Sequence, residues 1–343
     1  VMNIVSDEGN ARIFIRDDYS LVIDSTGLDI SLKLLSKHGY GHYDGKKDCK
    51  IIDKVNRCYA SINIQEGTAA LDGPLVKNLD MKKTVNTRKD FTLECDQGTA
   101  LMALELSQTE RVLDISNIDV DEEITKVKTE WSEFLSRMPV VPEKHAYYSV
   151  LAWYTTWSCF ARANDTYKYD AILMSKQHMS SVWSWDHCFN ALILSYVDPQ
   201  AALEQLLLPF EVQAESGALP DMWNPNDEIV WGVTKPPIHG WCFDKMMDRH
   251  EYSQEVYVKV YGHLSRWTDW WMNFRDTDKD GIPEYPQGCD SGWDGSSLFE
   301  IGYFLESPDL PAFLVLQMNT LARIAEKLNK TEEASTWKQR GEM

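Results

Sequence analysis

The residues best suited to chemistry lie in one short run, Gly-Cys-Asp-Ser-Gly-Trp-Asp-Gly-Ser-Ser at 288–297. The run sets two carboxylates, Asp290 and Asp294, among glycines, serines and one tryptophan. Glycines let the backbone approach a ligand closely, and the indole of Trp293 offers a flat apolar face. A carboxyl group beside such a face can have its pKa raised enough to act as an acid near neutral pH. The composition suits the binding and protonation of a carbohydrate, and a polar turn between two helices is the alternative.

A second acidic run precedes the first. Carboxylates alternate along it and a glycine follows them, so that the candidate metal ligands are Asp276, Asp278, Asp280, Ile282 and Glu284. Oxygen ligands at the first, third and fifth places can wrap a hard cation such as Ca²⁺. A complete calcium hand has a glutamate at the twelfth place, where Gln287 stands, so Glu284 would have to substitute for it. The run predicts either a structural Ca²⁺, with no organic cofactor, or a solvated acidic turn.

The elements that must position these residues change character near residue 115. Before that point, apolar residues alternate with polar ones in short runs, and turns such as Ser-Thr-Gly at 25–27 separate the runs. This pattern is typical of an antiparallel β-sandwich. After it, apolar residues recur at helical spacing, as in the stripe Val260, Leu264, Trp267 and Trp271. Long Trp-rich loops between such helices favour an α/α toroid whose loops build a site.

We therefore predict an α+β multidomain fold. Its parts are an N-terminal β-sandwich at 1–115, a charged helical linker at 116–142 and an α/α toroid at 143–343. The sequence begins at Val1 and stops at Met343 within a charged helical stretch. We accordingly expect the toroid to be incomplete in this chain.

Composition limits the partners and the compartment. The 53 acidic and 34 basic residues give a formal net charge of −19, which argues against nucleic acid and anionic membrane surfaces as partners. The seven cysteines are scattered and show no Cys-x-x-Cys spacing, which argues against a disulfide framework and a structural zinc site. No apolar run approaches the ~18 residues of a membrane span. A reducing compartment, the cytoplasm, is the expected location.

Five motifs follow one another in the helical half. They are Val-Trp-Ser-Trp-Asp at 182–186, Gly-Ala-Leu-Pro-Asp at 217–221, Lys-Pro-Pro-Ile-His-Gly-Trp at 235–241, Ser-Gly-Trp-Asp-Gly-Ser-Ser at 291–297 and Asp-Leu-Pro-Ala-Phe-Leu at 309–314. In this order they resemble the (α/α)6-barrel α-glycosidases of the processing α-glucosidase I family, glycoside hydrolase family 63, to which trehalases are related. The resemblance covers roughly residues 145 to 340.

The resemblance implies that Asp294 is the general acid of a glycosidase that inverts the anomeric centre. Inversion needs a second carboxylate about 6.5–9.5 Å from the first to activate water. In the family this base is a glutamate in the later half of the barrel, which we expect beyond residue 343. The remaining half of the barrel is therefore expected from C-terminal sequence that this chain lacks.

Further substrate contacts follow from the same motifs. Asp186 is expected to hydrogen-bond a sugar hydroxyl, with a charge at a helix N-terminus as the alternative. Asp290 is expected to bind hydroxyls or to hold neighbouring donors. Asp221 stands where trehalases carry a substrate-contacting asparagine, but the arginine that follows in trehalases is absent here. Tryptophans complete the set: Trp183 and Trp185, which either stack on a sugar or lie in the core, Trp223, Trp241 in the pocket wall, and Trp293.

The sequence thus predicts a hydrolase that cleaves an α-glucosidic or related α-glycosidic bond in an oligosaccharide or small glycoside. Two alternatives remain open. One is a carbohydrate-binding or scaffold module without catalysis, and the other is a different (α/α)6 glycosidase, such as a trehalase or an α-L-rhamnosidase.

Overall fold

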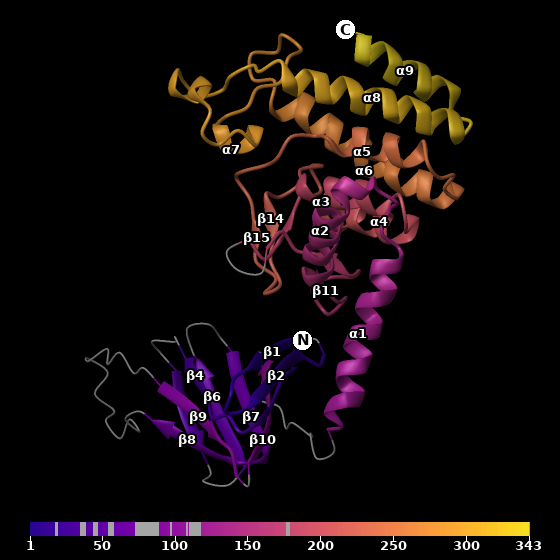
Figure 1. Ribbon diagram of the computed structural model, residues 1–343. Coiled ribbons are helices and arrows are strands. Elements are labelled where there is room, and N and C mark those ends of the chain that lie inside the picture. The colour runs from indigo at the N-terminus through magenta and orange to yellow at the C-terminus, as the bar shows by residue number, and fades with distance from the viewer. Residues whose placement is uncertain are drawn as a thin grey trace, which may run out of the picture. The chain divides into compact units, whose positions relative to one another are not determined.

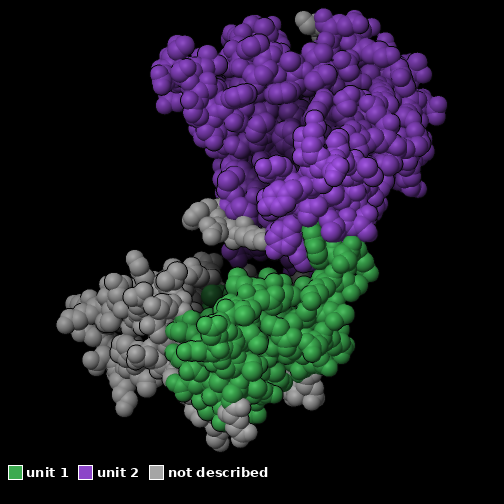
Figure 2. All heavy atoms as spheres, viewed as in Figure 1, with its two compact units in different colours: residues 1–133 green, residues 134–343 purple. Residues whose placement is uncertain are grey.

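The computed structural model describes residues 1–17, 20–34, 39–43, 47–53, 58–72, 89–96, 98–107, 109, 118–175 and 179–342. The chain divides into two compact units, Val1–Glu133 and Phe134–Met343, which are drawn in Figure 1 and Figure 2. The division falls inside the segment 116–142 that the sequence predicts as a linker. The predicted end of the β domain at residue 115 lies outside the described residues.

The described residues of unit 1 form two sheets, and every strand pairing among them is antiparallel. The larger sheet has the order β1 (Met2–Val5), β2 (Asn10–Ile15), β3 (Ser20–Thr26), β10 (Thr99–Ser107), β7 (Cys58–Glu66), β6 (Asp48–Asp53) and β5 (Gly39–Tyr43). The smaller sheet has the order β4 (Ile30–Leu34), β9 (Lys89–Glu94) and β8 (Thr68–Asp72). The predicted antiparallel character of this half is confirmed.

The larger sheet buries apolar residues on both faces. On one face, Ile23 and Met102 share a core cluster with Leu93 of the smaller sheet. On the other face, Val22 packs in a cluster with Ile124 of α1 (Val120–Ser136). Neighbouring residues of β3 are thus buried on opposite faces, because successive side chains of a strand point to opposite sides. Full burial of one such side chain contributes about 1.5–3 kcal/mol.

Unit 2 is mainly helical (Figure 1). Its principal helices are α2 (Ala146–Ser158), α3 (Asp186–Leu194), α4 (Pro199–Leu207), α5 (His239–Met247), α6 (Gln254–Phe274), α7 (Gly288–Ser291), α8 (Asp309–Lys327) and α9 (Thr331–Glu342). Its strands are short: β11 (Phe160–Ala161) pairs with β12 (Ala171–Ile172), and β14 (Met222–Trp223) lies between β13 (Val182–Trp183) and β15 (Ile229–Val230). Short 3₁₀ helices occur at η1 (Glu143–His145), η2 (Leu208–Val212) and η3 (Ser297–Glu300).

Helices α4 and α6 begin at residues whose side chains cap them. The Asp198 carboxylate accepts a hydrogen bond from the Ala201 amide ahead of Pro199, and the Ser253 hydroxyl accepts one from the Val256 amide. Such caps satisfy amides that the first helical turn leaves without partners. The predicted stripe of α6 forms core, with Trp267 and Trp271 fully buried. In the described part of the chain, no helix has the length and hydropathy that crossing a membrane would require.

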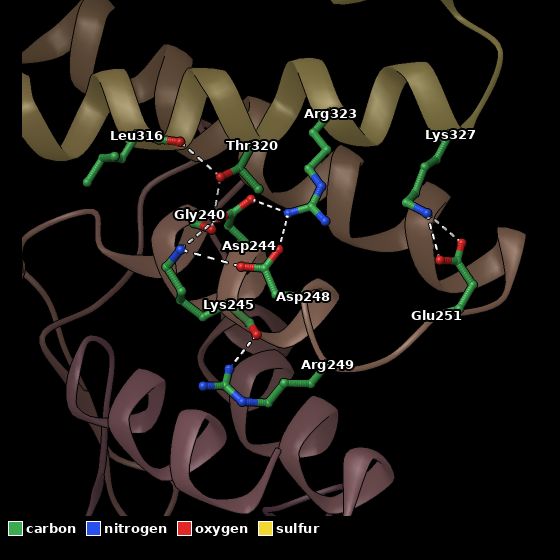
Figure 3. Close-up of polar contacts among 10 residues, drawn as sticks. All are labelled: Gly240, Asp244, Lys245, Asp248, Arg249, Glu251, Leu316, Thr320, Arg323 and Lys327. Atoms are coloured by element: carbon green, nitrogen blue, oxygen red, sulfur yellow. Dashed lines mark hydrogen bonds and ion pairs between the residues drawn. The ribbon is translucent and has the colours of Figure 1, made fainter. Parts of the chain in front are cut away.

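Helices α5 and α8 approach each other closely at Gly240. A Cβ atom placed on Gly240 would lie 2.6 Å from the Cα atom of Gln317, so only glycine fits there. Thr320 donates a hydrogen bond of 3.1 Å to the Gly240 carbonyl, and one turn further along α8 Arg323 donates to Asp244 at 2.7 Å and to Asp248 at 2.8 Å. Figure 3 shows these contacts. They fix the register of α5, which follows directly on the Lys-Pro-Pro motif.

Candidate active site

The motifs of the helical half meet at the N-terminal ends of α3 and α5. Strand β13 pairs with β14, and the Ser184 amide donates to the Asp221 carbonyl at 3.2 Å. Trp183 and Asp221 are therefore held side by side although nearly forty residues separate them. Asp186 follows as the first residue of α3.

Lys235 is a buried cation of this site. Its side chain is buried, with the residue 7% exposed. The ammonium group lies 3.4 Å from Asp221 Oδ1 and donates a 2.8 Å hydrogen bond to the Cys289 carbonyl. It also lies 5.7 Å from the centre of the Trp183 ring. Sequence reasoning did not single out Lys235, although it opens one of the five motifs.

Asp290 is completely buried. Its Oδ1 atom accepts a 2.7 Å hydrogen bond from the Thr234 amide, whereas Oδ2 is buried without a hydrogen-bond partner. Burial raises the pKa of Asp290, and the positive charges of Arg275 and Lys235 oppose that increase. Because it is buried and already accepts from the Thr234 amide, Asp290 suits the second of its two expected roles, which is to hold neighbouring donors.

Asp186 and Asp221 belong to the same electrostatic group. Burial is the largest cause that raises the pKa of each, and the positive charge of Lys235 lowers both values. The negative charge of Asp221 also raises the pKa of Asp186 and of Asp290. Since three predicted site carboxylates act on one another and on one lysine, the structure brings Asp186, Asp221 and Asp290 together.

Asp294 lies at the exposed side of this group. Its charge raises the pKa of Asp221, so it is near the cluster, yet the residue itself is exposed. Trp293 beside it is 68% exposed. The carboxylate expected to donate a proton is therefore open to a ligand, and the indole expected to contact a sugar is open as well.

The loop that carries Asp294 rests on Trp185. Gly292 has a left-handed φ of 73°, which favours glycine. A Cβ atom at Gly292 would lie 2.5 Å from Trp185 Cη2. Trp185 is half-buried under this glycine and packs edge-on against Phe189. The structure thus brings Trp185 to the loop, where it supports the backbone beside Asp294.

The other tryptophans divide between the site and its surroundings. Trp183 is half-buried beside Lys235, and its indole nitrogen is buried without a hydrogen-bond partner. Trp223 is buried in a core cluster, where its ring meets Tyr167 edge-on and its nitrogen donates to Asp227 at 3.0 Å. Its ring therefore has no open face for a sugar. Such a core position could not be distinguished from a binding position in the sequence.

Trp241 lines a cavity of about 430 Å³ between α5 and α8, together with Asp244, Lys245, Leu316, Asn319, Thr320 and Arg323. Phe189 connects Trp241 with Trp185, since its ring centre is 6.0 Å from that of Trp185 and 6.3 Å from that of Trp241.

Two buried histidines hold the backbone of the Trp-Ser-Trp segment. His187 Nδ1 lies 3.1 Å from the Trp183 carbonyl, and His239 Nε2 lies 2.9 Å from the Ser184 carbonyl. Burial lowers the pKa of His187 to about 3 and that of His239 to about 4. Both rings are therefore neutral at pH 7 and donate to these carbonyls. Their role is to position Trp183 and Trp185.

The acidic run at 276–284 gathers three carboxylates. Oxygen atoms of Asp276, Asp278 and Asp280 lie within 4.8 Å of one another. Glu284 is not part of this group, because its two oxygens accept hydrogen bonds from the amide and the hydroxyl of Thr277. The charge of Asp280 is the largest cause that raises the pKa of Glu306, so a further carboxylate faces the run.

Comparison with known proteins gives the class of the domain. Residues 179–342 match the model of the mannosylglycerate hydrolase MGH1-like glycoside hydrolase domain. An uncharacterized protein of Saccharomyces cerevisiae is 30% identical over 172 residues, which cover 44% of this chain and 14% of that protein. The glucosylglycerate hydrolase of Mycolicibacterium hassiacum is 22% identical over 153 residues, which cover 36% of this chain and 34% of that enzyme. The chain therefore spans about a third or less of these relatives' length.

A solved structure agrees in fold. A bacterial glucoamylase complexed with acarbose is similar with a TM-score of 0.52 at 13% identity, over 97% of this chain and 53% of the glucoamylase chain. The family match supports a glycoside hydrolase domain in residues 179–342, and the similar glucoamylase structure agrees in fold. The comparisons thus support the predicted glycosidase at this coarse level.

Proposed function

We propose that this domain hydrolyses an α-glucosidic or related α-glycosidic bond with inversion, as in glycoside hydrolase family 63, and that Asp294 is the general acid. The observation that carries the proposal is that two carboxylates close together in sequence differ in burial. Asp290 is buried among Asp186, Asp221 and Lys235, whereas Asp294 is exposed beside the exposed Trp293. Perturbed carboxylates that cluster at an open face are typical of catalytic sites.

The side chains then have distinct roles. Asp186 and Asp221 accept hydrogen bonds from hydroxyls of the sugar being cleaved, while Trp293 covers one face of its ring. Asp294 protonates the glycosidic oxygen as the bond to the leaving group breaks. Water attacks the anomeric carbon from the opposite face and loses a proton to a general base, a second carboxylate about 6.5–9.5 Å from the acid.

The substrate class is an oligosaccharide or a small glycoside. The name of the curated relative, glucosylglycerate hydrolase, supports a glucoside with a small leaving group. The acidic character of the site supports a neutral sugar ring next to the carboxylates, because an anionic ring would be repelled.

The experiment is an assay of the full-length protein with α-linked glucose disaccharides and with glucosylglycerate. Asp294→Asn should lower kcat about 10²–10⁴-fold, the usual contribution of a general acid. Asp165→Asn, at an exposed aspartate away from the motifs, serves as the matched control. A loss of less than about tenfold would contradict the assignment, and sugar binding without any hydrolysis by the unmodified protein would indicate the binding module instead.

We also propose that the acidic run binds one structural Ca²⁺ through Asp276, Asp278 and Asp280, with Ile282 as a further ligand. The residues fit a hard cation, since three carboxylate oxygens converge and Asp276 Oδ1 is buried without a hydrogen-bond partner. Bound Ca²⁺ would stiffen the segment leading to Asp294. Isothermal titration of chelator-treated protein should show about one Ca²⁺ per chain, and Asp278→Asn/Asp280→Asn should abolish the uptake; no uptake by the unmodified protein rejects the site.

The finer features of the fold belong with this proposal. We propose that the two sheets of unit 1, which share a core cluster, form a β-sandwich and that unit 2 is part of an (α/α)6 barrel. A cytoplasmic location is supported by the scattered spacing of the seven cysteines, which does not resemble a disulfide framework.

A further inference from the structure

Residues 234 and 235 hold the short helix that precedes Asp294. The Thr234 amide donates to the Asp290 carboxylate, and the Lys235 ammonium group donates to the Cys289 carbonyl. These contacts reach two consecutive residues of α7 from a segment more than fifty residues away in sequence. A helix of four residues has little stability of its own, because helix nucleation is costly. The position of α7 therefore depends on contacts of this kind.

Lys235 also connects α7 to the opposite side of the site. Its ammonium group lies 3.4 Å from Asp221 Oδ1 while it donates to Cys289. Thr234 reinforces the connection, since its hydroxyl donates to the Leu219 carbonyl at 3.3 Å. One lysine thus joins the loop of Asp294 to the loop of Asp221.

We propose that Lys235 is a positioning residue for Asp294: its ammonium group ties the acid-bearing loop to Asp221 and so fixes where the proton is delivered. The proposal rests on the proposed function, because it assigns Lys235 a task in that reaction. Lys235 is not assigned a contact with the substrate, since its ammonium group is already held by a carbonyl and a carboxylate.

The surrounding charges explain why a cation is needed at this place. The groups that act electrostatically on this cluster are Asp186 at the start of α3, Asp221 before β14, Asp290 in α7, Asp294 after it, and Arg275 at the end of α6. Without Lys235, the buried carboxylates would repel one another and α7 would move away from Asp221. A neutral side chain of similar length would fill the space but hold neither partner.

The test compares Lys235→Met with Lys338→Met in the full-length protein. Lys338 pairs with Glu326 on the exposed surface of the same unit, so its loss controls for the change of residue type. Hydrogen exchange read by mass spectrometry reports the mobility of 286–294. We expect exchange there at least tenfold faster in Lys235→Met, unchanged exchange in the buried part of α6, and no local change in Lys338→Met.

Kinetics separate positioning from a loss of folded protein. A displaced acid should lower kcat about 10–100-fold per folded molecule while KM changes less than about threefold, because a shift of ~1 Å can cost about 10²-fold. If Lys235→Met does not fold, the double variant Lys235→Met/Asp221→Asn removes both charges and still leaves the Cys289 carbonyl unheld. Unchanged exchange of 286–294 in the folded variant overturns the proposal.

The exchange measurement is independent of activity, so the two proposals can fail separately. A protein without hydrolytic activity that still shows the local increase would leave Lys235 as the tether of this loop and would contradict only the proposed reaction. Rapid hydrolysis together with unchanged exchange would contradict only the role of Lys235.

Discussion

Unit 2 contains two groups of carboxylates and cations that differ in burial. In the first group, Lys235 lies 3.4 Å from Asp221, and their side chains are only 9% and 11% exposed. In the second group, Arg323 lies 2.8 Å from Asp248, and their side chains are 36% and 47% exposed (Figure 3). The pKa of Asp221 is raised, mainly by burial, whereas the hydrogen bond from Arg323 lowers the pKa of Asp248.

The difference shows what burial does to an ion pair. Near the surface, the attraction of Arg323 outweighs the small loss of hydration, and the carboxylate is stabilised as an anion. At the buried site, the loss of hydration outweighs the attraction of one lysine, which Asp186 and Asp290 must also share. The exposed group joins two helices, whereas in the buried group the pKa values of the carboxylates stay raised.

The largest expected effect on stability is at the buried cation. Lys235→Met should lower the free energy of unfolding by about 3–5 kcal/mol, because it leaves buried carboxylates without their cation. Arg323→Met should lower it by about 1 kcal/mol or less, since its partners are largely hydrated. Urea unfolding at pH 7 measures both. Equal losses of unfolding free energy in the two variants would show that the difference in burial does not change what the two cations contribute to stability.

The next effect concerns the backbone beside the acid. Gly292→Ala should lower the free energy of unfolding by about 2 kcal/mol, because its φ of 73° is left-handed and its Cβ atom would meet Trp185. Gly295→Ala is the matched control, since nothing lies within 4 Å of its Cβ position. Thermal unfolding followed by circular dichroism compares them. A Gly292→Ala protein as stable as the control would mean that the loop does not rest on Trp185.

The smallest effect is a difference in pH dependence. The pKa of Asp290 is raised from 3.8, which means that the folded protein holds the proton of this carboxyl group more tightly than the unfolded chain does. The stability that this proton binding contributes is present below pH 3.8 and is lost as the pH rises through the folded-state pKa. The pKa of Asp248 is lowered from 3.8, so its contribution is present above that value and is lost as the pH falls through the folded-state pKa.

Relative to the unmodified protein, Asp290→Asn should therefore gain stability as the pH rises from about 3 to 7, and Asp248→Asn should lose stability as the pH rises from about 2 to 5. Unfolding midpoints across this range provide the measurement. Slopes of the same sign would contradict the opposite pKa directions on which the comparison depends.

The sequence predicted the acidic residues of the site better than it predicted the residues that contact them. Asp186, Asp221 and Asp290 could be named because each stands in or next to a motif through which the chain resembles the glycosidases of family 63. Lys235 could not be assigned, because its partners Asp221 and Cys289 become neighbours only after folding. Trp223 was expected at the substrate, but its ring is enclosed by a core cluster that no local pattern reveals.

The fold, too, could be predicted only where the sequence pattern is local. Helical spacing predicted the buried stripe of α6, and alternation predicted antiparallel strands, because both patterns are local. The close approach of Gly240 to Gln317 is not local, since it depends on two helices that are more than sixty residues apart. Glu284 stays a prediction as a metal ligand, and the sequence did not show that both of its oxygens accept hydrogen bonds from Thr277.

The central claim is that Asp294 donates the proton, and a substrate that needs no proton tests it most directly. The measurement is the ratio of kcat/KM for Asp294→Asn relative to the unmodified full-length protein, with an α-linked glucose disaccharide and with α-glucosyl fluoride. Fluoride leaves without protonation, so we expect a loss of about 10²-fold or more for the disaccharide and less than about tenfold for the fluoride. Equal losses for the two substrates would contradict the assignment of Asp294 as the general acid.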